Sequence, residues 1–284
     1  MTGSPVRRSA APLLERPAIR TSRFADFCGL EELTKQCGHD KEDWIHVIAK
    51  ELIDNALDAC EDLNIAPVIS VEVTEDYKII ITDNGPGLPD DTIAGVIDFG
   101  VRVSSREAWV SPSRGQQGNA LKCVIAMGFA LTGTCGTTLI ESHGLAREIV
   151  FQMDRVRRTP TILPLVISSS NVKTGTRITV HWPREACDLL DDAKPYFLQL
   201  AAQCVTFNPH LTMRGTWFGE EFLNVAASDP GWRKWRTCDP TSSHWYTPDL
   251  FERYAGAHIS RDQDNGSTRR TVADFIAELD GLKA

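Results

Sequence analysis

The chain has 284 residues, of which 42% are hydrophobic and 24% charged, with a net charge of -8 at pH 7. This length holds one large domain or one domain with a small appendage, and the composition is ordinary for a soluble globular protein. The negative balance argues against a strong nucleic-acid clamp, because phosphate binding depends on clustered Lys and Arg, although a local basic patch is still compatible with it.

Cysteine usage and hydropathy indicate the compartment. The eight cysteines form no CxxC pair and share no metal-ligand spacing with the seven histidines, which favours reduced thiols. No apolar run is long enough to cross a bilayer. Arg7 and Arg8 are followed by no apolar stretch of the kind found in secretory signals. We therefore expect a cytoplasmic protein that does not associate with membranes.

Three regions are expected along the chain. Residues 1–23 hold five Arg and one Glu among Pro, Ser and Ala, which is typical of a flexible N-terminal arm. Residues 24–220 are expected to form the main domain. Residues 221–284 begin with a stretch of little periodicity and are expected to form a linker followed by a small helical segment.

Hydrophobic periodicity predicts the elements of these regions. The strongest signal is a helix at 44–62, where apolar residues recur at helical spacing. Further helices are expected at 24–37, 90–99, 119–130, 188–204, 249–258 and 271–282. Strands are expected at 67–74, 78–82, 134–143, 148–156, 161–168, 175–182 and 211–218, the last region holding one strand or two.

The helix at 44–62 carries Glu51, Asn55 and Asp58 on one face, because these residues are spaced by four and three positions. A carboxylate that faces a nucleotide can activate water against phosphorus. The neutral oxygen of Asn55 suits Mg²⁺, which prefers hard oxygen ligands. Asp58 and Asp54 could support such a site or be solvated, and an ordinary amphipathic helix remains the alternative for this pattern alone.

The strand at 78–82 ends abruptly at Asp83, which is followed by Gly85 and Gly87. A carboxylate at a strand end can accept a hydrogen bond from an exocyclic amine such as that of adenine. The glycines would let the chain pass close to the base. An ordinary Asp-Asn-Gly turn is the alternative, but its position soon after the Glu/Asn helix favours a nucleotide site.

A glycine-flanked loop at 114–118 opens the helix at 119–130, which places free backbone N–H groups where phosphates can bind. The loop lacks the spacing of a Walker A motif. Lys122, one turn into the helix, could reach a phosphate or lie on the surface. Thr176, after Gly175, could orient Asp83 or a water molecule.

The order of these motifs is Glu-x3-Asn-x2-Asp-Ala, Asp-x-Gly-x-Gly, Gly-x-x-Gly-x-Ala and Gly-Thr, and it resembles the GHKL ATPases. Within that family the chain most resembles the B subunit of type IIB DNA topoisomerase (topoisomerase VI), through the strings at 113–118 and 207–210. The resemblance implies an α+β fold of the Bergerat type, a two-layer sandwich whose mixed sheet carries helices on one face. It also implies that 221–284 forms a helix-two-turn-helix-like segment.

The resemblance implies roles for individual residues. Glu51 would be the catalytic base, Asn55 the Mg²⁺ ligand and Asp83 the adenine contact, with Gly85 and Gly87 shaping the pocket. Thr176 would assist at the adenine end and Asp58 would have a less defined task, while residues 100–118 would form a lid over the phosphates. The remaining ATP-binding residues would be Ser104, Ser105, Arg114, Gly115, Gln116, Gln117, Gly118, Asn119 and Lys122.

The implied cofactors are ATP and Mg²⁺, and the implied assembly is an ATP-dependent homodimer with a Toprim-type DNA-cleaving partner, so that DNA contact would be indirect. Two ATP-bound copies would exchange N-terminal arms and close a gate that hydrolysis reopens. The topoisomerase protein continues into a transducer domain that supplies a lysine to the terminal phosphate. Since the sequence ends at Ala284, it is expected to be a fragment or a short relative whose partner supplies those parts.

Two other functions are compatible with the motifs. The chain could be a nucleotide-dependent clamp with little turnover, an interpretation that an intact Glu51 disfavours. It could also be a histidine-kinase catalytic domain, which would need an upstream phospho-acceptor histidine where residues 1–40 offer only His39.

Overall fold

The computed structural model describes residues 23–99, 119–234, 239–264 and 270–282. The chain divides into two compact units, Met1–Arg233 and Lys234–Ala284. The first unit continues past the predicted boundary at 220, because the strand that begins at Glu220 pairs with the preceding strand of that unit. The predicted N-terminal arm lies almost wholly outside the described residues.

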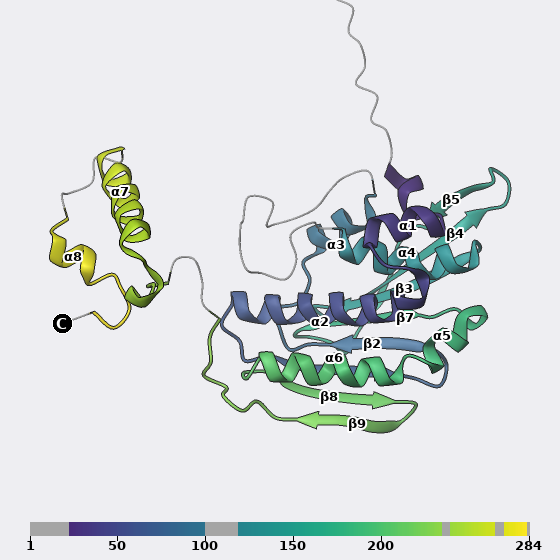
Figure 1. The fold of residues 1–284 in the computed structure, drawn as a ribbon. Helices are drawn as coiled ribbons and strands as arrows, with labels where there is room; N and C mark the ends of the chain where they lie inside the picture. The colour runs from purple at the N-terminus through teal and green to yellow at the C-terminus, as the bar shows by residue number, and fades with distance from the viewer. Residues whose placement is uncertain (1–22, 100–118, 235–238, 265–269, 283–284) are drawn as a thin grey trace, which may run out of the picture. The chain divides into compact units, whose positions relative to one another are not determined.

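A mixed sheet forms the centre of the first unit (Figure 1). The described strands follow the order β5-β4-β3-β7-β2-β1-β8-β9, with β6 also paired to β4. All neighbouring pairs are antiparallel except β1 and β8, which are parallel. The strands are β1 (Val68–Val73), β2 (Lys78–Thr82), β3 (Cys135–Ser142), β4 (Leu145–Asp154), β5 (Thr159–Ile162), β6 (Val166–Ser169), β7 (Thr176–His181), β8 (Thr212–Trp217) and β9 (Glu220–Val225).

Helices cover one face of this sheet, with α2, α4 and α6 packed against the strands (Figure 1). The α-helices of the unit are α1 (Leu30–Cys37), α2 (Trp44–Asp62), α3 (Asp90–Ile97), α4 (Ala120–Thr132), α5 (Cys187–Asp191) and α6 (Lys194–Phe207). Short 3-10 helices are Arg23–Phe27, Lys41–Asp43 and Arg184–Ala186. This arrangement confirms the predicted α+β fold with a mixed sheet and helices on one face.

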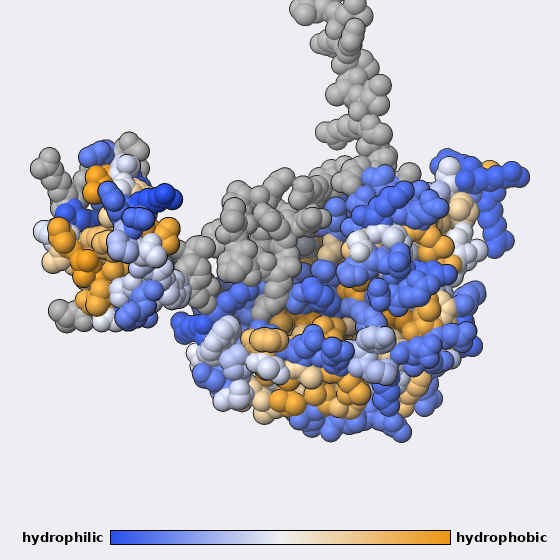
Figure 2. All heavy atoms as spheres, viewed as in Figure 1, coloured by the Kyte–Doolittle hydropathy of each residue, from blue (hydrophilic) through white to orange (hydrophobic). Residues whose placement is uncertain are grey.

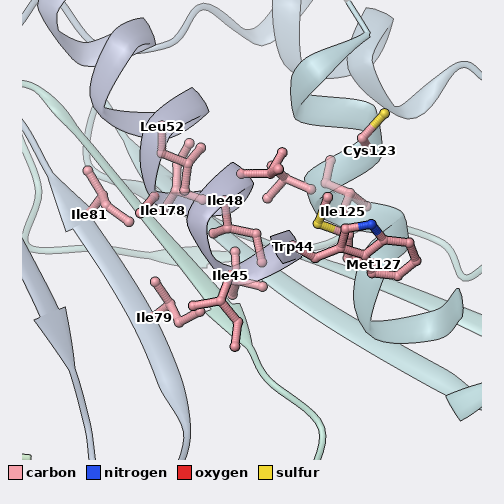
Figure 3. Close-up of a cluster of buried hydrophobic side chains, with 14 of the residues drawn as sticks. Trp44, Ile45, Ile48, Leu52, Ile79, Ile81, Cys123, Ile125, Met127 and Ile178 are labelled. Atoms are coloured by element: carbon pink, nitrogen blue, oxygen red, sulfur yellow. The ribbon is translucent and has the colours of Figure 1, made fainter. Parts of the chain in front are cut away.

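The hydrophobic core lies between the sheet and these helices. The stripe of α2 packs between isoleucines of the sheet and the apolar side of α4, as Figure 3 shows. Each fully buried apolar side chain contributes on the order of 1.5–3 kcal/mol to folding. The labelled residues of this layer are Trp44, Ile45, Ile48, Leu52, Ile79, Ile81, Cys123, Ile125, Met127 and Ile178.

Three predicted elements are wrong in their continuity. The helix expected at 24–37 is the 3-10 helix Arg23–Phe27 followed by α1, because Gly29 has an extended backbone between them. The strand expected at 161–168 is two strands, β5 and β6, because Pro164 has no N–H to donate and the chain leaves the ladder there before pairing with β4 again. The helix expected at 188–204 is also interrupted, between α5 and α6. Pro195 occupies the first turn of α6, where a missing N–H costs nothing, and it could not sit inside a continuous helix.

The second unit contains a 3-10 turn (Ser243–Trp245), α7 (Pro248–Asp264) and α8 (Val272–Ile276). An aromatic cluster joins the two helices, since Tyr254 and Phe275 have ring centroids 5.6 Å apart. Arg270 adds ion pairs to Asp262 and Glu278 at 2.7 and 2.5 Å. Among the helices described in either unit, none has the length and apolarity to span a bilayer.

Candidate nucleotide site

Glu51, Asn55 and Asp58 lie along α2 with different exposures. Glu51 is partly buried, Asn55 is exposed and Asp58 is only 4% exposed, so Asp58 is not a solvated surface carboxylate. Burial raises the pKa of Glu51, opposed by the ammonium group of Lys50, which lies 3.9 Å from its carboxylate. A carboxylate with a raised pKa accepts a proton more readily than a solvated one, which suits a general base.

Asp83 stands directly after β2, where the antiparallel pairing with β7 brings it beside Thr176. Its Oδ1 accepts hydrogen bonds from the backbone N–H groups of Gly85 at 2.7 Å and Thr176 at 3.2 Å. Its own N–H donates to the carbonyl of Thr176 at 2.9 Å. Burial raises the pKa of the Asp83 carboxyl, and the hydrogen bonds from Gly85 and from the backbone and side chain of Thr176 lower it. The carboxylate is thereby held in one orientation.

The glycines around Asp83 are required by close contacts. A Cβ at Gly85 would lie 2.9 Å from Asp83 Oδ1, and one at Gly87, where φ is +89°, would lie 2.7 Å from Ser142 Oγ. At Gly175, where φ is +74°, a Cβ would lie 1.9 Å from the carbonyl oxygen of Asp83. A side chain at any of these three positions would therefore collide with a neighbouring group, so glycine lets the backbone pass close to Asp83 and Ser142.

The Asp83 loop lies against α2, the helix that carries Glu51 and Asn55. A Cβ at Gly85 would lie 3.7 Å from Cβ of Ala59, one turn beyond Asn55 and two turns beyond Glu51. Glu51 is therefore ~12 Å along the helix from Ala59. The helix α4 packs against α2. Burial, the Cys37 thiol and the Glu51 carboxylate raise the pKa of Cys123, in the first turn of α4, to about 12.

Comparison with known proteins agrees with this arrangement. The sequence profile described as "Histidine kinase-, DNA gyrase B-, and HSP90-like ATPase" matches residues 40–186, more than half of the chain. The chain belongs to this ATPase family. The match includes the α2 residues, the Asp83 loop, α4 and Thr176, so the GHKL resemblance is confirmed at the level of the family.

Curated relatives of this GHKL ATPase carry the name of the B subunit of type 2 DNA topoisomerase 6. The protein of Archaeoglobus fulgidus is 29% identical over 172 residues, covering 58% of this chain and 28% of the relative. That of Pyrococcus horikoshii is 39% identical over 138 residues, covering 46% of this chain and 24% of the relative. The chain spans about a quarter of the length of these relatives.

Two solved structures are also similar. The Aquifex aeolicus MutL ATPase domain complexed with ADP is 18% identical, with a TM-score of 0.40, and the match covers 64% of this chain and 62% of that one. The topoisomerase IV ATP-binding domain of Francisella tularensis, complexed with a small-molecule inhibitor, is 21% identical, with a TM-score of 0.38 and coverage of 61% and 83%.

Lys122 of this GHKL ATPase is not a surface residue. Its side chain is 1% exposed, and Nζ donates a hydrogen bond to the backbone carbonyl of Asp98 at 2.6 Å, 5.8 Å from the centroid of the Phe99 ring. The surface alternative is therefore wrong, because the ammonium group joins the first turn of α4 to the end of α3. Contact of Lys122 with a phosphate stays a prediction.

The predicted lid at 100–118 lies outside the described residues. It contains Ser104, Ser105, Arg114, Gly115, Gln116, Gln117 and Gly118. Asn119 is described and directly precedes α4, where its carbonyl accepts the N–H of Cys123 at 2.9 Å.

Three polar side chains that support the GHKL site were not predicted from the sequence. Asn84 accepts the N–H of Val68 at 2.8 Å, and Ser142 Oγ accepts the N–H of Leu88 at 2.8 Å. Arg147, 3% exposed, pairs with Asp90 in the first turn of α3. A charged residue inside the apolar strand 145–154 is the signal that could have pointed to Arg147.

Proposed function

We propose that this chain binds ATP with Mg²⁺ and hydrolyses it, and that it works as the ATPase part of a complex resembling topoisomerase VI. The residues present fit the nucleotide, since Asp83 offers a carboxylate held in one orientation between glycine backbones. They also fit the metal, because the exposed Asn55 presents a hard oxygen one turn from Glu51. Bound Mg²⁺ would neutralise phosphate charge during transfer.

The protein groups have separable tasks in this proposal. Asp83, held by Gly85 and Thr176, accepts the exocyclic amine of adenine and so selects the base. Glu51 removes a proton from the attacking water, and its raised pKa makes it a stronger base than a solvated glutamate. Asn55 would hold the metal. The observation that carries the proposal is that the Asp83 loop lies against α2 at Ala59. The adenine contact therefore lies beside the helix that carries Glu51.

The wider role is also proposed. The relatives named after topoisomerase 6 support an ATP-dependent homodimer that drives a DNA-cleaving partner protein, with residues 100–118 as the lid and residues 1–23 as the exchanged arm. ATP would favour the closed dimer only through contacts that the open state lacks. Light scattering with and without a non-hydrolysable ATP analogue tests this, and an unchanged mass at saturating analogue would contradict it.

The ATPase assignment is tested by comparing Glu51→Gln with Asp83→Asn. Glu51→Gln, which removes the general base, is expected to reduce phosphate release by about 10²–10⁴-fold, while calorimetry still detects binding of a non-hydrolysable ATP analogue. Asp83→Asn is expected to abolish analogue binding. Glu72→Gln, which changes an exposed glutamate on β1, is the control and should retain both activities. If wild type and Glu51→Gln show the same negligible turnover but both bind the analogue, the chain is a nucleotide clamp instead.

A further inference from the structure

The hairpin that joins β4 to β5 ends in a basic turn. Residues 155–158 read Arg-Val-Arg-Arg, and all four are exposed, with Val156 92% exposed. The hairpin extends from the β5 edge of the sheet, and the surface over it in Figure 2 is mostly hydrophilic. The chain as a whole has a net charge of -8, so three arginines within four residues form a local region of opposite charge.

This turn is preformed. Asp154 Oδ1 accepts the backbone N–H groups of Val156 at 2.8 Å and Arg157 at 2.9 Å, so the acidic side chain is occupied by the backbone of the turn. Arg158 adopts a φ of 53°, which completes the reversal. None of the three guanidinium groups forms an ion pair with a described residue, so their donors face solvent. The fold therefore presents positive charge here on a defined loop.

The turn is too far from the nucleotide site to serve its phosphates. At the nucleotide end, β3 finishes at Ser142, which pairs with Thr176 on one side and Leu145 on the other. β4 then runs away from that end for its whole length to Asp154, a separation of ~30 Å at the usual rise per residue. The ligand of these arginines must be another molecule.

We propose that the 155–158 turn binds the phosphate backbone of duplex DNA. Guanidinium groups donate in a planar fork that matches phosphate oxygens, and contacts of this kind position a protein on DNA without reading its sequence. Val156 lies between the arginines and would contact the sugar edge. The proposal rests on the DNA-remodelling role proposed above, and it replaces the expected indirect contact with a direct one.

The test is a salt titration of duplex binding by fluorescence anisotropy, using the full chain and a labelled duplex of mixed sequence. The triple variant Arg155→Ala/Arg157→Ala/Arg158→Ala removes three phosphate contacts. It should reduce the magnitude of the slope of log affinity against log salt concentration by about 3. A control with the same charge change, Arg184→Ala/Arg214→Ala/Arg253→Ala, removes three exposed arginines elsewhere and should leave the slope unchanged. Circular dichroism and analogue binding check that each variant folds.

Other outcomes overturn the proposal. Equal losses in the two triple variants would mean general attraction by net charge, and an unchanged slope in the hairpin variant would mean that DNA is bound elsewhere or not at all. Wild-type DNA binding by the hairpin variant together with loss of self-association would assign the turn to an acidic protein surface. Because the assay needs no hydrolysis, a failure here is distinct from failure of the ATPase assignment, which Glu51→Gln tests separately.

Discussion

At the end of the sheet where β2 stops, Asp83 is enclosed by backbone groups, and a methyl group on Gly175 would collide with it. At the opposite end, the turn at 155–158 has no ion pair with the described residues, and Val156 is almost fully exposed. The first end is organised for a ligand of defined shape, since its polar groups are held before the ligand arrives. The second offers charge, which suits a polyanion of variable sequence.

The largest expected effect concerns the apolar layer behind the nucleotide end. Leu52 of α2 is 2% exposed, so Leu52→Ala should reduce the free energy of unfolding by about 2–5 kcal/mol, because a buried side chain leaves a cavity. Urea denaturation measures this. Leu63→Ala, at the end of the same helix but 57% exposed, is the control and should change stability by no more than ~0.5 kcal/mol.

Next in size is the close approach at Gly175. Gly175→Ala should cost about 1–3 kcal/mol of stability because of its positive φ, and should also weaken ATP-analogue binding, because the methyl group displaces Asp83. Gly219→Ala is the control, since φ there is +81° but no atom lies within 4 Å of the added carbon. If both variants bind the analogue equally well, the tight packing at Asp83 does not shape the pocket.

The pH dependence of turnover tests the environment of Glu51. Because the pKa of Glu51 is raised, the folded state favours the protonated carboxyl. Glu51 therefore contributes its full stabilisation below the ordinary pKa of 4.5, and this stabilisation is lost as pH rises through the raised pKa. Hydrolysis needs the ionised form, so kcat/KM should rise through that same raised pKa. Lys50→Met should move this acid limb to higher pH, because Lys50 lowers the pKa, whereas Lys41→Met should leave it in place.

The smallest expected effect is at the hairpin end. Val156→Ser should change the free energy of unfolding by no more than ~0.5 kcal/mol, because the side chain is already in solvent. Its effect on DNA affinity should be modest, with an unchanged salt slope, since no charge is lost. A stability loss comparable to that of Leu52→Ala would show that the two ends are packed alike and would remove the contrast between them.

Local patterns predicted much of this molecule. The helix at 44–62 has the predicted bounds, because its apolar repeat and its polar face are both encoded within one segment. The Asp83 turn was recognised for the same reason. The break at Pro164 was also readable in principle, but the apolar residues on both sides of it resembled a single strand.

By itself, the sequence determined most of the helices and strands and which residue types could bind a nucleotide, because periodicity and glycine placement act over a few residues. Only the tertiary structure decided three pairings. Lys122 is buried and donates a hydrogen bond to Asp98, Arg147 forms an ion pair with Asp90, and the Thr176 N–H donates a hydrogen bond to Asp83. These partners are separated by 24, 57 and 93 positions, respectively. Their pairing depends on how the sheet and helices pack, which no local pattern records.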